Sequence, residues 1–285
     1  MKYKTIKVDN LDIFYREAGN PSNPKILLLH GFPSSSRMFN ELMVSLSKDY
    51  HLIAPDYPGF GQSSSPSTSD YKYTFDNLAS TISKFIDLVG FEKFSIYVQD
   101  YGGPVGFRIA TQRPSAIQAI IVQNANAYLE GFGEATKALN DYVMNPNAEN
   151  EKPIRDFMTL EGTKWQYTDG AENILKINPD SYITDQYYLD RPGNKEIQLE
   201  LVRNYGSNVA LYDTWHNYFR IYQPLTLVIS GKNDKLFIEK GAIAYKKDIK
   251  NAQISLLNGG HFVLEEKHKE AAQLIKDFLR KNLKK

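Results

Sequence analysis

Four short segments of the chain contain residues that could together perform covalent hydrolysis. They are His30-Gly31-Phe32-Pro33, Val98-Gln99-Asp100-Tyr101-Gly102-Gly103, Gly231-Lys232-Asn233-Asp234 and Gly259-Gly260-His261-Phe262. Two acids and a histidine, in the order Asp100, Asp234 and His261, can supply a nucleophile, an orienting acid and a general base. Each segment alone is a weak signal. Their order, and their position after apolar runs of the chain, favour a catalytic triad.

These residues predict a division of roles. Asp100 would attack the substrate, His261 would act as base, and Asp234 would orient and stabilise the imidazole. The main-chain N–H groups of Phe32 and Tyr101 are expected to form an oxyanion hole. A carboxylate is suited to in-line displacement at an sp³ carbon, which leaves an alkyl-enzyme ester for a His-activated water to hydrolyse. The chain contains no Gly-x-Ser-x-Gly elbow, so a serine esterase is not favoured.

The elements around Asp100 predict a sharp turn between a strand and a helix. The preceding residues 94–99 are rich in β-formers and read as a short buried strand. Gly102 and Gly103 remove the Cβ atoms that would block the turn, and a helix-like pattern follows. A side chain at the tip of this turn lies beside the first free N–H groups of the helix, where an anion is stabilised.

Further apolar runs predict a mostly parallel sheet. Residues 25–29, 51–55, 119–122, 225–230 and 254–257 read as buried strands, and 3–8 and 11–16 as an N-terminal hairpin. Helical patterns follow several of these runs, and the last carries Leu274, Ile275, Phe278 and Leu279. Because the carboxyl ends of parallel strands form the ligand-binding edge, the separated segments can converge there.

The β/α alternation stops over a long stretch that is rich in aromatic residues and leans towards helix. The sequence therefore predicts an α/β fold with a mostly parallel central sheet flanked by helices and an inserted helical lid. We expect a core domain of residues 1–126 and 223–285 and a helical cap domain of residues 127–222.

The composition narrows the classes of partner. The 285 residues carry a formal net charge of +1, which favours neither nucleic acid nor an anionic membrane surface. The absence of Cys excludes disulfides, thiolate catalysis and Cys-ligated metal sites. Neither a signal-peptide segment nor an apolar run long enough to span a bilayer is present, so we expect a cytoplasmic protein. We expect a small-molecule substrate, no cofactor and no metal; the oligomeric state is left open.

The same motifs resemble those of the α/β-hydrolases, in the aspartate-nucleophile branch that contains haloalkane dehalogenases and epoxide hydrolases. His30-Gly31-Phe32-Pro33 resembles the H-G-x-P motif of epoxide hydrolases, and the segment around Asp100 is similar to the V-Q-D-W-G-G elbow of some haloalkane dehalogenases. Asp56-x-x-Gly59-x-Gly61-x-Ser63 matches a further core motif of the family. The resemblance covers the predicted core and does not extend to the lid.

The resemblance leaves the leaving group open. Haloalkane dehalogenases hold the halide with a Trp after the nucleophile and a second Trp or an Asn, whereas this chain has Tyr101 and Phe32 at the matching positions. Epoxide hydrolases use lid tyrosines to meet the opening alkoxide, and tyrosines are abundant in the predicted lid. We therefore expect epoxide hydrolase-like activity on a small apolar substrate, with haloalkane dehalogenase as the alternative. A non-catalytic binder or receptor for a small ligand, on the same fold, is a second alternative. The candidate contacts to the leaving group or substrate are Trp165, Tyr212, Trp215 and Tyr218.

Overall fold

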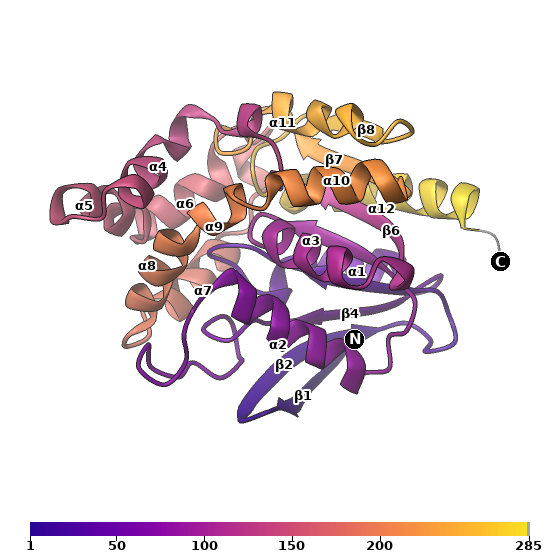
Figure 1. Ribbon diagram of the computed structural model, residues 1–285, viewed down its shortest axis with the longest axis horizontal. Helices are drawn as coiled ribbons and strands as arrows, with labels where there is room; N and C mark the ends of the chain where they lie inside the picture. Colours follow the sequence, from indigo (N-terminus) through magenta and orange to yellow (C-terminus); the bar gives the residue numbers. More distant parts are fainter. Residues whose placement is uncertain (284–285) are drawn as a thin grey trace.

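A single eight-stranded sheet organises the molecule (Figure 1). The computed structural model describes residues 1–283. The strands are β1 (Lys2–Val8), β2 (Leu11–Ala18), β3 (Lys25–Leu29), β4 (His51–Pro55), β5 (Phe94–Gln99), β6 (Ile117–Gln123), β7 (Thr226–Gly231) and β8 (Gln253–Leu257), in the order β1-β2-β4-β3-β5-β6-β7-β8. β2 is antiparallel to β1 and β4, and all other neighbours are parallel. The predicted fold class is confirmed.

Both faces of the sheet are buried under helices, which explains why the central strands read as continuous apolar runs. The helices are α1 (Asn40–Leu46), α2 (Phe75–Leu88), α3 (Gly102–Gln112), α4 (Lys137–Met144), α5 (Ala148–Phe157), α6 (Leu160–Thr168), α7 (Pro179–Leu189), α8 (Asn194–Asn204), α9 (Gly206–Val209), α10 (Tyr212–Tyr222), α11 (Glu239–Ala244) and α12 (Leu264–Asn282). Short 3-10 helices are η1 (Ser36–Phe39), η2 (Pro114–Ala116), η3 (Leu129–Gly131), η4 (Glu134–Thr136), η5 (Ile174–Lys176) and η6 (Tyr245–Lys247).

Alternating residues of the strands divide the core into two layers. On β3, Leu27 and Leu29 pack with side chains of α2, α3 and α10, while Ile26 and Leu28 pack with side chains of α1 and α12. The same alternation continues on β5, where Val98 faces the first layer and Tyr97 the second.

The chain between β6 and β7 contains α4 to α10 and corresponds to the predicted cap. In Figure 1, α4 to α8 gather to one side of the sheet, whereas α10 lies beside α3. The helix α10 belongs to the predicted cap but packs on the core helix α3. The division between core and cap at residues 127 and 222 therefore stays a prediction.

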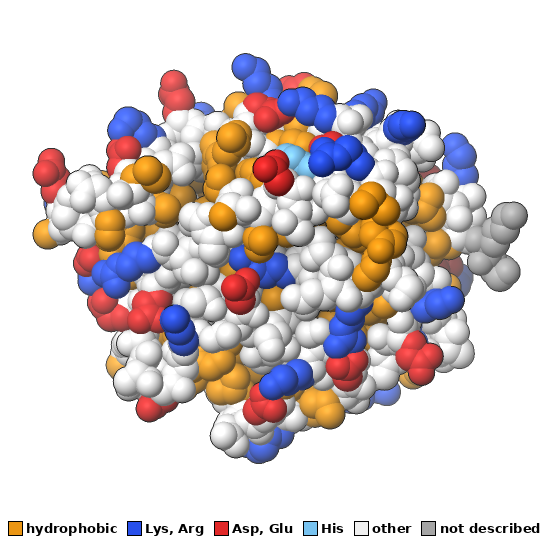
Figure 2. Space-filling model, viewed as in Figure 1, with side chains coloured by type: hydrophobic (Ala, Val, Ile, Leu, Met, Phe, Trp, Pro, Cys, Tyr) orange, Lys and Arg blue, Asp and Glu red, His pale blue; other side chains and the backbone are white. Residues whose placement is uncertain are grey.

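Charged residues of both signs are interspersed on the surface shown in Figure 2. Within residues 1–283, no helix is long and apolar enough to cross a membrane. The same part of the chain holds no group of three or more His, Cys, Asp or Glu placed to bind a metal ion.

A glycine in α3 allows this helix to pack closely against β5. A Cβ atom added at Gly106 would lie 2.4 Å from Cγ1 of Val98 and 3.1 Å from Cδ1 of Ile96. These strand side chains are themselves buried and cannot move aside freely. The missing side chain at residue 106 thus sets the distance between the helix and the strand that together carry Asp100.

We predict that Gly106→Ala lowers the free energy of unfolding by about 1–3 kcal/mol, because overpacking outweighs the better helix propensity of alanine. Urea denaturation measures the change. Gly206→Ala is the control: an added Cβ there meets only Cγ1 of Val143, at 3.2 Å, so we expect a change below about 1 kcal/mol. A Gly106→Ala protein as stable as the parent would contradict the tight packing of α3 on β5.

Candidate active site

Asp100 occupies the tip of the turn between β5 and α3, as the sequence predicted. Its backbone has φ +49°, a left-handed conformation that costs a residue with a side chain about 1–3 kcal/mol. The turn is held by the N–H of Asp100 on Asn124 O (3.2 Å) and the N–H of Gly103 on Asp100 O (2.9 Å). Gly102 is required here because a Cβ would lie 2.1 Å from Leu29 O on the neighbouring strand.

The two predicted oxyanion amides lie at the Asp100 carboxylate. The N–H of Phe32 donates to Asp100 Oδ1 at 2.7 Å, and the N–H of Tyr101 also acts to lower the pKa of this carboxyl group. Gly31 allows the approach, because a Cβ there would lie 2.3 Å from Cβ of Asp100. Burial raises the pKa of Asp100, and the His261 imidazole and the two amides only partly oppose that rise. The two amides therefore stabilise the anionic carboxylate and point to where an oxyanion would form.

His261 follows β8 and connects the two acids. Its Nδ1 lies 2.8 Å from Asp234 Oδ2, and its Nε2 lies 3.9 Å from Asp100 Oδ2. Burial lowers the pKa of His261, but the carboxylates of Asp234 and Asp100 outweigh it, so the pKa lies above its ordinary value. The arrangement gives Nδ1 a carboxylate partner and directs Nε2 towards the candidate nucleophile.

Asp234 is almost fully buried and firmly held. Besides the imidazole, Asp234 Oδ2 accepts from Nδ2 of Asn124 at 2.7 Å. Asp234 Oδ1 accepts from the N–H groups of Leu236 (2.8 Å) and Phe237 (3.2 Å). With four donors around it, the carboxylate has a single orientation towards the ring of His261.

Two buried glutamines, for which the sequence predicted no role, also contact His261. Nε2 of Gln99 lies 3.1 Å from the imidazole Nε2, and Nε2 of Gln123 donates to the His261 carbonyl oxygen at 3.1 Å. The hydroxyl of Tyr97 donates to Oε1 of Gln123 at 3.1 Å. Their positions in the sequence could have indicated this role, because Gln99 and Gln123 are the last residues of β5 and β6, which end at the edge of the sheet that carries the site.

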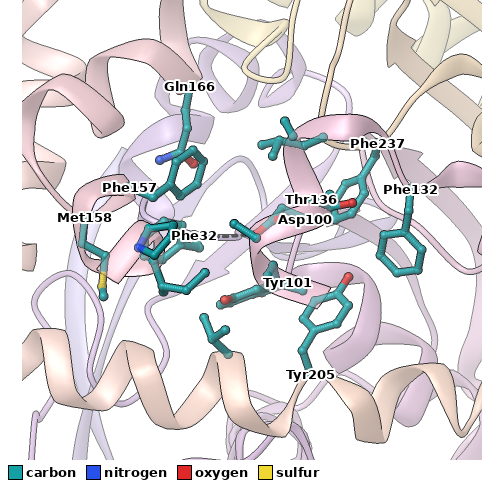
Figure 3. A pocket seen from close by; sticks show the side chains of 17 residues that line it. Phe32, Asp100, Tyr101, Phe132, Thr136, Phe157, Met158, Gln166, Tyr205 and Phe237 are labelled. Carbon is teal, nitrogen blue, oxygen red and sulfur yellow. Dashed lines mark hydrogen bonds between the residues drawn. The ribbon is translucent and has the colours of Figure 1, made fainter. Parts of the chain in front are cut away.

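A largely apolar pocket opens on Asp100 (Figure 3). Its volume is about 100 Å³. The pocket lies between the strand ends and the predicted cap, and its remaining lining is Phe32, Tyr101, Phe132, Ala135, Thr136, Ala138, Leu139, Pro153, Ile154, Phe157, Met158, Gln166, Val202, Tyr205, Leu236 and Phe237.

Tyr205 is the tyrosine of the predicted cap that the structure brings to this pocket. It follows α8, its ring centroid is 6.1 Å from that of Tyr101, and its hydroxyl points towards the turn of Asp100 in Figure 3. Burial, with the negative charge of Asp100 among further causes, holds the pKa of Tyr205 well above its ordinary value. The phenol therefore remains protonated and can donate a hydrogen bond.

None of the four predicted leaving-group contacts lines the pocket. Tyr212, Trp215 and Tyr218 lie on α10, which packs along α3, so their side chains are buried away from the cavity. The ring centroid of Trp215, for example, lies 5.3 Å from that of Phe107 on α3. On α6, Trp165 packs against Phe157, and the following residue, Gln166, lines the cavity instead. Helical periodicity could not reveal which face of these helices is turned to the pocket.

Comparisons with known proteins identify the family of this fold. A family model for the alpha/beta hydrolase fold matches residues 24–268, which confirms the fold and the resemblance inferred from the sequence. The chain is 40% identical over 262 residues to "Uncharacterized hydrolase YNR064C" of Saccharomyces cerevisiae, covering 90% of this chain and 89% of that protein. It is 34% identical over 112 residues to "Haloalkane dehalogenase 2" of Mycobacterium tuberculosis, covering 39% of this chain and 38% of that protein. The solved structure of a mutant of haloalkane dehalogenase DatA from Agrobacterium tumefaciens superposes with a TM-score of 0.82 at 23% identity, covering 98% of this chain and 96% of that one. At this identity the likeness concerns the fold.

We predict that Asp234→Asn lowers the pKa of His261 by about one unit or more, because burial then acts without the charge of the paired carboxylate. Histidine-selective NMR titration measures the shift. Asp12→Asn, at a carboxylate that is 57% exposed and bridged to Lys7, is the control and should leave the titration unchanged. An unaltered titration in Asp234→Asn would show that this carboxylate does not set the charge of the imidazole.

Proposed function

Because the chain belongs to the α/β-hydrolase fold family and is a hydrolase of that fold, we propose that it hydrolyses small apolar epoxides through an ester on Asp100. One observation carries the proposal: a buried carboxylate, with amide N–H groups on one side and a histidine on the other, opens on an apolar pocket that also contains phenol groups. The cavity volume of about 100 Å³ lies below the range of about 300–1,000 Å³ usual for drug-sized ligands, which favours a small substrate.

In the first step Asp100 attacks one carbon of the epoxide ring, a C–O bond of the ring breaks, and an alkyl ester forms. The electron pair of the broken bond remains on the former ring oxygen. The hydroxyl of Tyr205 supplies a proton to this alkoxide, leaving a phenolate. The apolar wall of the pocket excludes bulk water and strengthens this hydrogen bond.

In the second step Nε2 of His261 takes a proton from water, and the resulting hydroxide adds to the carboxyl carbon of Asp100. The N–H groups of Phe32 and Tyr101 hold the oxyanion of the tetrahedral intermediate. Its collapse breaks the bond to the substrate oxygen and restores the Asp100 carboxyl group. The protons held by the imidazole and by that carboxyl group then neutralise the diol alkoxide and the phenolate, so the balance is one epoxide and one water to one diol.

The polar groups of the pocket favour an epoxide over a halide. An alkoxide needs a proton, which a phenol can transfer, whereas a halide is held by hydrogen bonds alone. Neither Trp165 nor Trp215 is part of the lining, and Phe32 offers no side-chain N–H. Haloalkane dehalogenation remains a second candidate because a relative bears that name. A panel of terminal epoxides scored for diol, and of primary bromoalkanes scored for bromide, separates the two reactions.

A binding protein without catalysis is the alternative from another class. Such a protein has no need for the left-handed turn of Asp100 or for four donors around Asp234. Retention of these costly features favours an enzyme.

We predict that His261→Gln accumulates a covalent adduct on Asp100, because loss of the general base slows ester hydrolysis by about 10²–10⁴-fold. Peptide mass spectrometry locates the adduct, and the double variant Asp100→Asn/His261→Gln should form none. In the parent enzyme, a single turnover in ¹⁸O-labelled water should place the label in the Asp100 carboxylate. Turnover confined to p-nitrophenyl esters, at a rate that Asp100→Ala leaves unchanged, would refute the mechanism.

We further predict that Tyr205→Phe slows epoxide opening by about 10²-fold, the usual loss for one donor to a developing oxyanion. Stopped-flow measurement of ester formation tests this step. Tyr187→Phe is the matched control, since Tyr187 is 71% exposed, and should retain the parent rate. Equal rates in Tyr205→Phe and the parent would exclude Tyr205 as the proton donor.

A further inference from the structure

Gln99, the residue before the nucleophile, contacts the only nitrogen of His261 that can act as a base. We propose that its carboxamide is a positioning group that serves both protonation states of the imidazole. The amide N–H donates to neutral Nε2 until the water of the second step takes its place. After a half turn, the amide oxygen accepts from the protonated Nε2 until that proton passes to the diol alkoxide. The inference concerns the second step of the proposed function and rests on it.

The resting geometry fits the first state. Nδ1 of His261 donates to Asp234, so Nε2 of the neutral ring carries a lone pair. Nε2 of Gln99 lies 3.1 Å from that nitrogen and is a donor. Gln99 is 0% exposed, so this contact is shielded from bulk solvent.

The other end of the same amide points to the second state. Oε1 of Gln99 is buried and has no hydrogen-bond partner among residues 1–283. Unpaired buried oxygens are rare in native proteins and call for an explanation. The terminal torsion of a glutamine is broad and roughly two-fold, so a half turn exchanges oxygen and nitrogen at little steric cost.

Residue 31 leaves room for this exchange. A Cβ atom at Gly31 would lie 2.7 Å from Oε1 of Gln99, so a side chain there would crowd the outer end of the amide. Glycine keeps that space free of a side chain, and the NH₂ group can enter it.

The chemistry requires a new acceptor when the imidazolium forms. The charged groups that face the ring are the carboxylates of Asp234 and Asp100; the rings packed against it, Phe237 and Phe262, carry no charge. Asp234 is already engaged at Nδ1. Asp100 lies 3.9 Å from Nε2, and in the ester its carboxyl group has lost its negative charge. The amide nitrogen of Gln99 lies 3.1 Å from Nε2, so a half turn of the amide brings its oxygen to that place as an acceptor.

Two substitutions and one control test the proposal. Gln99→Glu places beside Nε2 a carboxylate that accepts hydrogen bonds but cannot donate them. Gln99→Met keeps the length of the side chain but removes both the donor and the acceptor of the amide. Gln198→Met is the matched control, since Gln198 is only 1% exposed and its Oε1 also has no partner in the described chain. For each protein, ¹⁵N NMR of His261 without substrate reports the state of Nε2, and single-turnover kinetics with styrene oxide separate ester formation from ester hydrolysis.

We expect Gln99→Glu to raise the His261 titration midpoint by more than about one unit and to slow ester hydrolysis at pH 7 at least tenfold. Gln99→Met should move the ¹⁵N resonance of neutral Nε2 towards the value of an imidazole nitrogen whose lone pair accepts no hydrogen bond. It should also slow ester hydrolysis at least tenfold even at pH 9, with ester formation changed less than threefold. Gln198→Met should match the parent in both measurements.

An unchanged Nε2 resonance in Gln99→Met would overturn the proposed contact. Equal losses of ester formation and ester hydrolysis would overturn the positioning role and indicate a structural one. The NMR measurement needs no substrate, so it tests the contact even if no epoxide is turned over. If Gln99→Glu does not fold, Gln99→Met alone decides, because its predicted loss is confined to one step.

Discussion

The carboxylate of Asp100 is buried, and much of the surrounding structure offsets the free-energy cost of keeping a charge there. Burial favours the neutral acid, while two amide N–H groups, the start of α3 and the nearby imidazole favour the anion. All of these groups are backbone or are themselves held by buried partners. The site is therefore preorganised by the fold, and little reorganisation is needed when charge moves during a reaction.

Close packing of the backbone makes this arrangement possible. The turn brings β3, β5 and α3 so near to one another that side chains are excluded at Gly31, Gly102 and Gly106. The strain of the left-handed residue at the tip is supported by the sheet, whose strands are buried on both faces. Stability of the core and placement of the nucleophile at the pocket thus arise from the same contacts.

A buried polar cluster joins the predicted cap to the loops of the site. Arg37, in the segment that follows Phe32, donates to the side chain and carbonyl of Ser181 on α7, both at 3.0 Å. Tyr167 of α6 donates to Asp185 and stacks on Phe262, beside the imidazole, with ring centroids 3.9 Å apart. Burial raises the pKa of Asp185 to about 6, although Arg37 opposes the rise. These contacts hold α6 and α7 of the predicted cap against the loops that carry Phe32 and His261.

Sequence alone determined the elements whose signals are local. Apolar runs predicted six of the eight strands and an N-terminal hairpin pattern the other two. The paired glycines predicted the turn of Asp100, and the strand ends predicted that Asp100, Asp234 and His261 converge. Only the tertiary structure decided which cap residues reach the substrate. A helix presents several faces, and packing of α10 on α3 turned Trp215 inward while the end of α8 placed Tyr205 over the pocket. The partners of the imidazole likewise depend on distances across the sheet, because Gln99 and His261 are 162 residues apart in the chain yet in contact.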